Sequence, residues 1–210
     1  DAPIHYTLDG SEPTAASPRY TGPVEIGKSA RFRATALREG GENASYSREF
    51  AFSKSTGRPA VLNTKPNDSY TFEGASLLVD GYHSRPVFTS GAWLGYLDEP
   101  LDVTIDMGGE QSYRSVELET LAEKGDWIFP PSSVTVWVSD NGTDFTEVAS
   151  VAVPEAKAGD ADGIGRYRMQ FPETSARYLK VVAQNAAAIP AWHPGAGSKG
   201  FLFVDEVVVE

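Results

Sequence analysis

The pattern that most constrains the fold of this 210-residue chain is a series of short β-branched or aromatic runs with turn residues between them. Turn signals stand at Asp9-Gly10, Gly40-Gly41, Gly108-Gly109 and Asn141-Gly142. No segment has the apolar period of an amphipathic helix. Regularly spaced strands without helices indicate a sandwich or barrel, so we predict an all-β protein. The expected strands are residues 4–8, 23–26, 30–37, 48–53, 102–107, 114–120, 133–139, 146–153, 165–171, 178–184 and 201–209.

The composition, with 40% hydrophobic and 22% charged residues, is that of an ordinary globular protein. The net charge of −11 argues against nucleic acid or an anionic membrane as the main partner. Cysteine is absent, which excludes disulfides and thiolate metal sites and favours a bacterial source for an extracellular β-rich module. No apolar stretch approaches the length that a bilayer requires, so we expect no membrane insertion.

The best linker candidate is the polar, breaker-rich run Lys-Ser-Thr-Gly-Arg-Pro at residues 54–59. We therefore predict a first domain at residues 1–54, a linker at 55–60 and a second domain at 61–210. The chain opens directly on a strand-like run without the features of a signal peptide. We expect it to be a fragment of a longer protein.

The first domain carries the segment Ile-His-Tyr-Thr-Leu-Asp-Gly-Ser-Glu-Pro-Thr at residues 4–14, followed by Ser-Pro-Arg-Tyr at 17–20 and a later strand at 31–34. These motifs resemble the small fibronectin-like β-sandwich found C-terminal in chitobiases and bacterial β-hexosaminidases. The family's first strand has no counterpart here, so we expect an N-terminally truncated copy. Nothing in this part of the chain suggests chemistry.

The second domain contains four ordered motifs, at residues 78–81, 101–108, 134–145 and 178–182, before a closing strand with Val204-Asp205-Glu206-Val207. Together they resemble the discoidin or coagulation factor (F5/8) type C domain, which as a sugar binder is carbohydrate-binding module family 32. The resemblance implies a discoidin-like (galactose-binding-like) jelly-roll β-sandwich. Residues 91–96, 127–130 and 192–197 are similar to the version attached to Bacteroidetes β-N-acetylhexosaminidases of glycoside hydrolase family 20.

The loop at residues 191–199 places Trp192, His193 and Lys199 on glycine-rich, proline-bounded backbone. An aromatic plane beside hydrogen-bonding groups suits a sugar ring. The alternative is that Trp192 folds back and plugs the end of the sandwich. The candidate sugar-binding residues, some of them taken from the resemblance, are His83, Arg85, Lys124, Trp127, Trp192, His193 and Lys199.

The family's usual later Arg and Asn are replaced here by Trp127-Ile128-Phe129. This departure puts a galactose-type specificity in question. Trp93 and Trp137 adjoin or lie within expected strands, so we predict that they are packed rather than presented to a ligand.

The resemblance also implies a structural Ca²⁺ ion beneath the binding loops, since hard oxygen ligands suit this ion. The matching positions are Asp80, Thr89, Asp205 and Glu206. Tyr82 stands where the family usually has Asn or Asp, which removes one candidate ligand. Without a metal, Asp80 would serve as a turn residue bonded to its own loop.

A catalytic site is not expected. The related hexosaminidases use an Asp-Glu pair on a (β/α)₈ barrel, and the chain lacks the helices and length for a barrel. The tempting pair Asp205-Glu206 lies on a strand, where neighbours point to opposite faces. Asp98-Glu99 precedes a proline in a predicted exposed turn. The three histidines are too dispersed for a metal motif.

The predicted function is therefore that of non-catalytic modules of a secreted, periplasmic or surface β-N-acetylhexosaminidase of bacterial origin. Their partners would be glycans containing N-acetylhexosamine or galactose-type sugars, and the catalytic domain of the same polypeptide. Two alternatives remain open. The modules brace the catalytic barrel, or the second domain is a protein- or lipid-binding discoidin adhesion domain.

Overall fold

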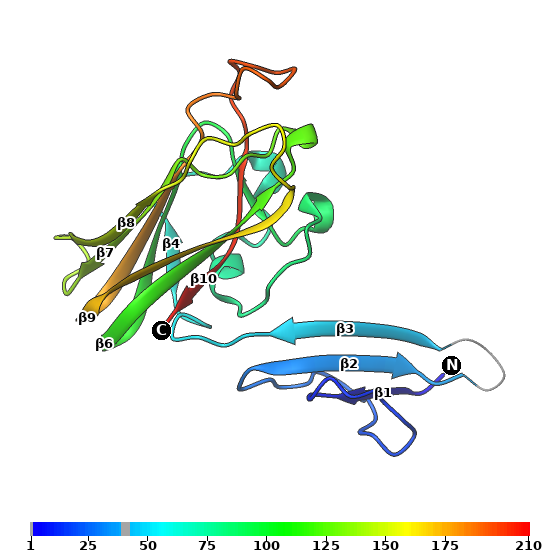
Figure 1. Cartoon of the computed structure of the whole chain (residues 1–210). Helices are drawn as coiled ribbons and strands as arrows, with labels where there is room; N and C mark the ends of the chain where they lie inside the picture. The colour runs from blue at the N-terminus through cyan, green and yellow to red at the C-terminus, as the bar shows by residue number, and fades with distance from the viewer. Residues whose placement is uncertain (1, 39–42) are drawn as a thin grey trace. The chain divides into compact units, whose positions relative to one another are not determined.

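The computed structural model of the protein describes residues 2–38 and 43–210, and it confirms the all-β prediction (Figure 1). The chain forms two compact units. Unit 1 comprises Asp1–Phe52 together with Gly81–His83, and unit 2 comprises Ser53–Asp80 and Ser84–Glu210. The predicted turn at Gly40-Gly41 lies outside the described residues.

Unit 1 is built on an antiparallel sheet of β1 (Ile4–Thr7), β2 (Ala30–Ala36) and β3 (Ala44–Phe50), in that order. One face carries small apolar and aromatic residues in register, with Tyr6 opposite Ala34 and Ala34 opposite Tyr46. The strand predicted at residues 23–26 is irregular.

The two faces of this sheet are covered differently. On the polar face His5 is buried, and its Nδ1 lies 2.7 Å from the carbonyl oxygen of Ser17 in the loop after β1. On the apolar face Ile4 and Tyr46 remain exposed. The sheet thus covers its polar side with its own chain and leaves its apolar side partly open.

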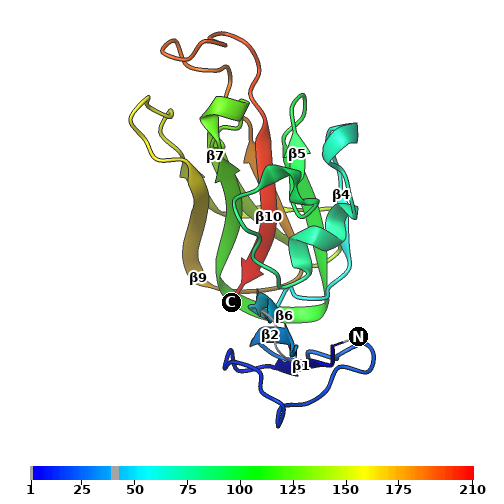
Figure 2. The same ribbon diagram turned by 90° about the vertical axis from the view of Figure 1, so that its right-hand side faces the viewer.

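Unit 2 contains a seven-stranded antiparallel sheet that bends back on itself, because β6 and β9 are long enough to serve both layers (Figure 2). The first part of β6 pairs with β4 and with the end of β9, which also pairs with β7. The second part of β6 pairs with β10 and with the start of β9. The strands are β4 (Ala60–Leu62), β5 (Leu94–Tyr96), β6 (Leu101–Ala122), β7 (Ser133–Ser139), β8 (Thr146–Ala152), β9 (Gly163–Gln184) and β10 (Leu202–Val209).

The Gly108-Gly109 pair, predicted to form a turn, is instead a bulge within β6. The pairing of β6 with β9 shifts register between Asp106 and Gln111, and Gly108 has a φ of 79°. Glycine tolerates this backbone conformation, and bulges bend a strand. Two strands predicted at 102–107 and 114–120 are therefore one bent strand, and the same holds for β9.

The interior of unit 2 is a cluster of aliphatic side chains from both layers, including Ile105, Leu118, Val136 and Val181, all inaccessible to solvent. A second buried cluster lies around Trp93, which packs with Leu121, Ile128 and Phe203. The prediction that Trp93 is packed is confirmed. Trp137 on β7 is only half-buried.

The predicted linker is not an independent joint, because residues 53–58 are bonded into unit 2. Ser55 is fully buried, and its hydroxyl donates to the carbonyl of Val207 at 2.5 Å. The N–H of Lys54 donates to the carbonyl of Val209, and that of Gly57 to the carbonyl of Val79. The polar and helix-breaking residues that suggested a linker instead form a tight turn that is hydrogen-bonded to β10.

Within residues 2–38 and 43–210, the strands are connected by short 3₁₀ helices: η1 (Asp68–Tyr70), η2 (Gly74–Val79), η3 (Phe88–Ser90) and η4 (Lys124–Asp126). No helix in the described ranges has both the length and the apolar character needed to cross a membrane.

Candidate functional site

Three loops gather at one end of unit 2, where Figure 2 shows them above the strands. They are residues 123–132 after β6, residues 153–162 between β8 and β9, and residues 185–201 between β9 and β10. Trp127 and Trp192 are exposed on these loops, by 42% and 40%. We call Trp127, Trp192 and His193 the tryptophan apex.

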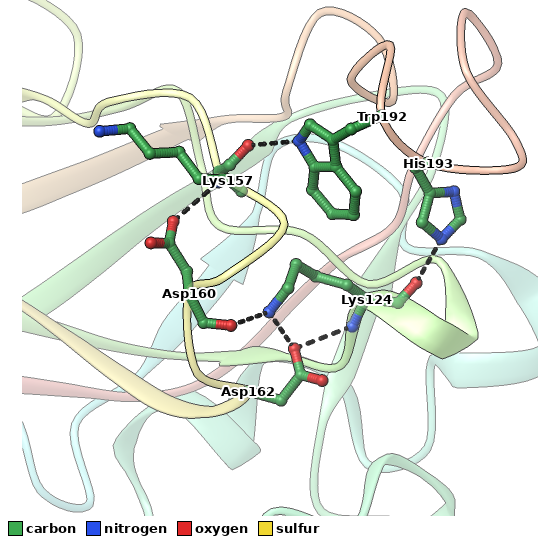
Figure 3. Close-up of polar contacts among 7 residues, drawn as sticks. Lys124, Lys157, Asp160, Asp162, Trp192 and His193 are labelled. Atoms are coloured by element: carbon green, nitrogen blue, oxygen red, sulfur yellow. Dashed lines mark hydrogen bonds and ion pairs between the residues drawn. The ribbon is translucent and has the colours of Figure 1, made fainter.

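His193 is the buried centre of the apex, 8% exposed. The backbone N–H of Gly195 donates to Nδ1 at 3.0 Å, and Nε2 lies 2.9 Å from the carbonyl oxygen of Lys124 (Figure 3). Because Nδ1 accepts, Nε2 carries the proton and donates. The ring therefore ties the loop at 191–199 to the turn at η4. His193, predicted to contact sugar, uses both nitrogens within the protein.

Trp127 is held in an uncommon backbone conformation, with φ 64° in the left-handed region. Its N–H donates to the carbonyl of Lys124 at 3.0 Å, and its carbonyl accepts from the N–H of Phe201 at 2.8 Å. Its indole lies against Gly195, where a Cβ would come within 2.8 Å of the ring. Non-glycine residues in this region persist where the surroundings hold them, often at functional sites.

Trp192 also contacts His193. Its Nε1 donates to the carbonyl of Ala156 at 3.0 Å, and its ring contacts His193 edge-on at a centroid distance of 5.6 Å. Trp127 meets the same imidazole edge-on at 6.0 Å. The plug alternative required a buried Trp192; with its ring 40% exposed, the side chain is instead anchored at its edge and open to solvent.

Lys124, another predicted sugar ligand, is buried beneath the apex. Its ammonium is paired with the carboxylate of Asp162 and donates to the carbonyl of Asp160 at 2.9 Å (Figure 3). The hydrogen bond from Lys124 lowers the pKa of Asp162. Lys124 thus joins the loop at 153–162 to η4 and supports the apex from below.

Two other predicted sugar ligands, Lys199 and Arg85, make their hydrogen bonds and ion pairs outside the apex. Lys199 is exposed and ion-paired with Asp98 at 2.7 Å. Arg85 is exposed, and its carbonyl accepts from Trp93 Nε1 at 3.0 Å. His83 is grouped with unit 1 rather than with the apex in unit 2.

The predicted calcium ligands differ in burial. Asp205 and Glu206 are both buried, whereas Asp80 and Thr89 are exposed. The described residues contain no group of three or more His, Cys, Asp or Glu side chains placed to hold a metal ion. The donor chemistry suits Ca²⁺, which also takes backbone carbonyl oxygens, such as that of Asp205, as ligands.

Asp205 occupies a bulge, since the pairing of β10 with β6 shifts between Val204 and Val207. The simple alternation assumed for Asp205 and Glu206 therefore does not hold at this point. Oδ2 of Asp205 accepts from the N–H of Ser84 at 2.7 Å. Burial, together with the nearby carboxylates of Glu119 and Asp80, raises the pKa of Asp205 to about 8. A bound cation would relieve this unfavourable concentration of charge.

The other carboxylate pair considered for catalysis lies at the surface. The carboxylate of Asp98 forms an ion pair with Lys199, and Oε2 of Glu99 accepts a hydrogen bond from the backbone N–H of Lys65 at 2.8 Å. Both residues bind parts of neighbouring loops in the structure.

Residues that the sequence interpretation missed include Gly195, Phe129 and Ala156. Gly195 makes room for Trp127, Phe129 packs against His193 at a centroid distance of 5.5 Å, and Ala156 anchors Trp192 through its carbonyl. Gly195 could have been noticed in the sequence, because it is one of the glycines that make the 191–199 loop glycine-rich.

Comparison with known proteins gives matches to families and to solved structures. Residues 1–50 match the profile of the Fn3 associated family. No curated protein sequence matches the chain.

The similar solved structures include several carbohydrate-binding modules. Chitosan-binding module 1 of a chitosanase/glucanase from Paenibacillus sp. IK-5 is 17% identical, with 75% of this chain and 98% of that chain covered and a TM-score of 0.49. A Clostridium perfringens module in complex with GalNAc-β-1,3-galactose is 16% identical, with 72% and 93% covered and a TM-score of 0.47. A fucose-binding module of Streptococcus pneumoniae is 22% identical, with 75% and 94% covered and a TM-score of 0.46. What each of these modules binds is a property of that module.

The match that covers most of the chain is to the profile of the F5/8 type C domain, which spans residues 63–199 and therefore well over half of the sequence. It includes the apex and most of the strands that build the predicted discoidin-like jelly-roll β-sandwich. The chain belongs to the F5/8 type C domain family.

Proposed function

We propose that this chain is a non-catalytic glycan-binding region whose ligand stacks on the tryptophan apex. The observation that carries the proposal is the pair of exposed indoles that each contact the buried His193 edge-on. Exposed tryptophans are costly unless they serve a surface contact, and their flat faces suit the C–H face of a sugar ring. The indole anchors and hydrogen-bonded loops fix the platform in advance, which lowers the entropic cost of binding.

The test is a glycan-array screen of the chain and of a Trp127→Ala variant. The proposal predicts that the chain binds a defined set of glycans and that the variant loses them. A chain that binds no glycan, or a variant that binds the same glycans equally well, would refute it.

The finer identity that we propose is the C-terminal part of a secreted, periplasmic or surface bacterial β-N-acetylhexosaminidase of glycoside hydrolase family 20. Its glycans would contain N-acetylhexosamine or galactose-type sugars. The match of residues 1–50 to the Fn3 associated family supports an auxiliary role beside another domain. The chain itself should not hydrolyse a chromogenic N-acetylglucosaminide, and turnover that persists through purification would contradict the non-catalytic part of this proposal.

A second candidate function is bracing of a further domain, and the partly open apolar face of unit 1 favours it. Ile4 and Tyr46 expose 40% and 54% of their surface there. A Tyr46→Lys change should then destabilise a longer polypeptide that contains the further domain, while the melting temperature of this chain alone stays unchanged. Equal effects on both would count against bracing.

We also propose that Ca²⁺ binds at the bulge of β10. Its candidate ligands are Asp80, Thr89, Glu206 and the carbonyl of Asp205, of which Glu206 and Asp205 are buried. Their burial beside other carboxylates supports a cation there, and hard oxygen ligands suit calcium. A ligand that binds only the folded state raises the melting temperature as its concentration exceeds the dissociation constant. Melting at the same temperature in chelator and in millimolar calcium would remove this proposal.

A further inference from the structure

A pocket of about 340 Å³ opens beside the apex in unit 2 and is not accounted for by stacking on the two tryptophans. It joins the apex directly, because Ala191 in its wall precedes Trp192 and Ala156 accepts the hydrogen bond from Trp192 Nε1. Phe129 at its base packs against both Trp192 and His193. A volume of this size accommodates one sugar residue, at the small end of ligand sites.

The wall of this pocket is unusually rich in methyl and ring carbons. Five alanines and four prolines line it, with Phe129, Val153 and Ile189. The alanines are Ala156, Ala186, Ala187, Ala188 and Ala191, and the prolines are Pro130, Pro131, Pro154 and Pro190. Such a wall favours a ligand that brings an apolar group with it, because burying apolar surface is the main gain available.

Several polar groups of the pocket are hydrogen-bond acceptors. Proline has no N–H, so four of the lining residues contribute only carbonyls. Ser132 already donates its hydroxyl proton to the carbonyl of Asn185 at 2.9 Å. Glu155 is exposed at the wall, and its carboxylate is paired with no cation among the described residues. The ligand should therefore supply N–H or O–H donors next to its apolar group.

We propose that this pocket is a second subsite, which takes a methyl-bearing sugar residue next to the residue stacked on Trp192. An acetamido group and the methyl of a 6-deoxy sugar are the two sources of this chemistry. Each places a methyl group beside N–H or O–H donors, as the alanine-proline wall and Glu155 require. The inference rests on the proposed glycan binding at the apex, and it adds a neighbouring pocket that selects sugars with a methyl group.

The experiment compares sugars that differ in the methyl group. N-acetylglucosamine is paired with N-formylglucosamine, and L-fucose with L-galactose, its 6-hydroxylated counterpart. Affinity is measured by NMR titration of the chain, with the Trp192 indole N–H reporting the apex and the methyl signals of Ala186, Ala187 and Ala188 reporting the pocket. A methyl group in an apolar pocket is worth about tenfold or more in affinity. The pair that shows this preference identifies the source.

Two variants make the result specific. Ala187→Leu reduces the pocket at an exposed position and should abolish the methyl preference while the Trp192 signal still responds to sugar. Ala161→Leu adds the same side chain at an exposed position outside the pocket and should keep the preference. A melting curve of each variant confirms that it folds, and Glu155→Ala serves as a second pocket variant, expected to weaken binding of the preferred sugar.

The outcomes separate the two proposals. A methyl preference that Ala187→Leu removes supports the subsite. If sugars shift the Trp192 signal without a methyl preference, or without shifts of the alanine methyl signals, the subsite proposal is wrong and the proposed glycan binding at the apex still stands. Sugars that shift neither set of signals overturn both.

Discussion

The imidazole of His193 donates from Nε2 to the backbone carbonyl of Lys124 at 2.9 Å, across 69 positions of sequence. This bond connects the loop that carries Trp192 to the turn that carries Trp127. With Gly195 donating to Nδ1, the ring has one tautomer, and its edge-on contacts set the spacing of the two indoles. The side chain that the sequence suggested as a sugar ligand acts as the tie that holds the platform together.

Replacing His193 by Ala should therefore weaken both the fold and the platform. The change removes one of the two hydrogen bonds to the Lys124 carbonyl, which keeps the bond from the Trp127 N–H, and it leaves the buried Gly195 N–H without its partner. An unsatisfied buried donor costs about 1–3 kcal/mol in the free energy of unfolding. Denaturant unfolding measures this cost. In the unmodified protein, NMR of the ring nitrogens should show the neutral tautomer protonated at Nε2. A ring protonated at Nδ1 instead would contradict the tie.

Gly195→Ala should disturb the apex from the other side. The added Cβ would lie 2.8 to 3.1 Å from three atoms of the Trp127 indole, so the ring must move. We expect a change in tryptophan fluorescence and loss of glycan binding. Gly125→Ala is the matched control, because a Cβ at Gly125 meets nothing within 4 Å. Equal behaviour of the two variants would show that the contact of Trp127 with Gly195 is unimportant.

Residues 53–58 should resist proteolysis, in contrast to the linker that their composition suggests. Ser55→Ala removes the buried bond to the Val207 carbonyl and should lower the free energy of unfolding by about 1–3 kcal/mol, because it leaves a buried acceptor unsatisfied. Limited proteolysis of the unmodified chain checks the first statement. Cleavage that begins within residues 53–58 would mean that this turn is open in solution.

Acid should weaken the contact between β6 and β9 at the bulge. Hydrogen bonds from Arg177, together with the N–H of Gly108, lower the pKa of Asp106 to about 2 from an ordinary value of 3.8. The stabilisation is therefore complete above pH 3.8 and is lost as the pH falls towards 2. Arg177→Met should move the Asp106 pKa back towards its ordinary value in a carboxyl NMR titration. An unchanged Asp106 pKa in the variant would show that Arg177 does not stabilise the Asp106 carboxylate.

The sequence predicted the fold class well because strand signals are local. It split or missed strands where the outcome depended on distant pairing. Gly108-Gly109 resembles a turn, yet β9 supplies a partner on both sides and converts it into a bulge. The three-residue strands Ala60–Leu62 and Leu94–Tyr96 are too short to show alternation, and they exist because β6 and β10 pair with them.

The candidate site was predicted in part, for a similar reason. The exposed tryptophans follow from their place on loops rich in breaking residues. The burial of Lys124 could not be predicted from the local sequence, because it depends on an ion pair with Asp162, which lies 38 positions later in another loop. The pocket depends on three loops whose alanines and prolines carry no signal of their own.

The most direct test of the central claim is one comparison of the unmodified chain with Trp192→Ala, measured by calorimetric titration with a glycan that the array identifies. Trp192 is 40% exposed, so its truncation should cost less than the ~3–5 kcal/mol of a buried aromatic residue. The account predicts that Trp192→Ala loses glycan binding by tenfold or more, with a melting temperature within a few degrees of the original. Unchanged affinity in a folded Trp192→Ala variant would contradict the tryptophan apex as the binding platform.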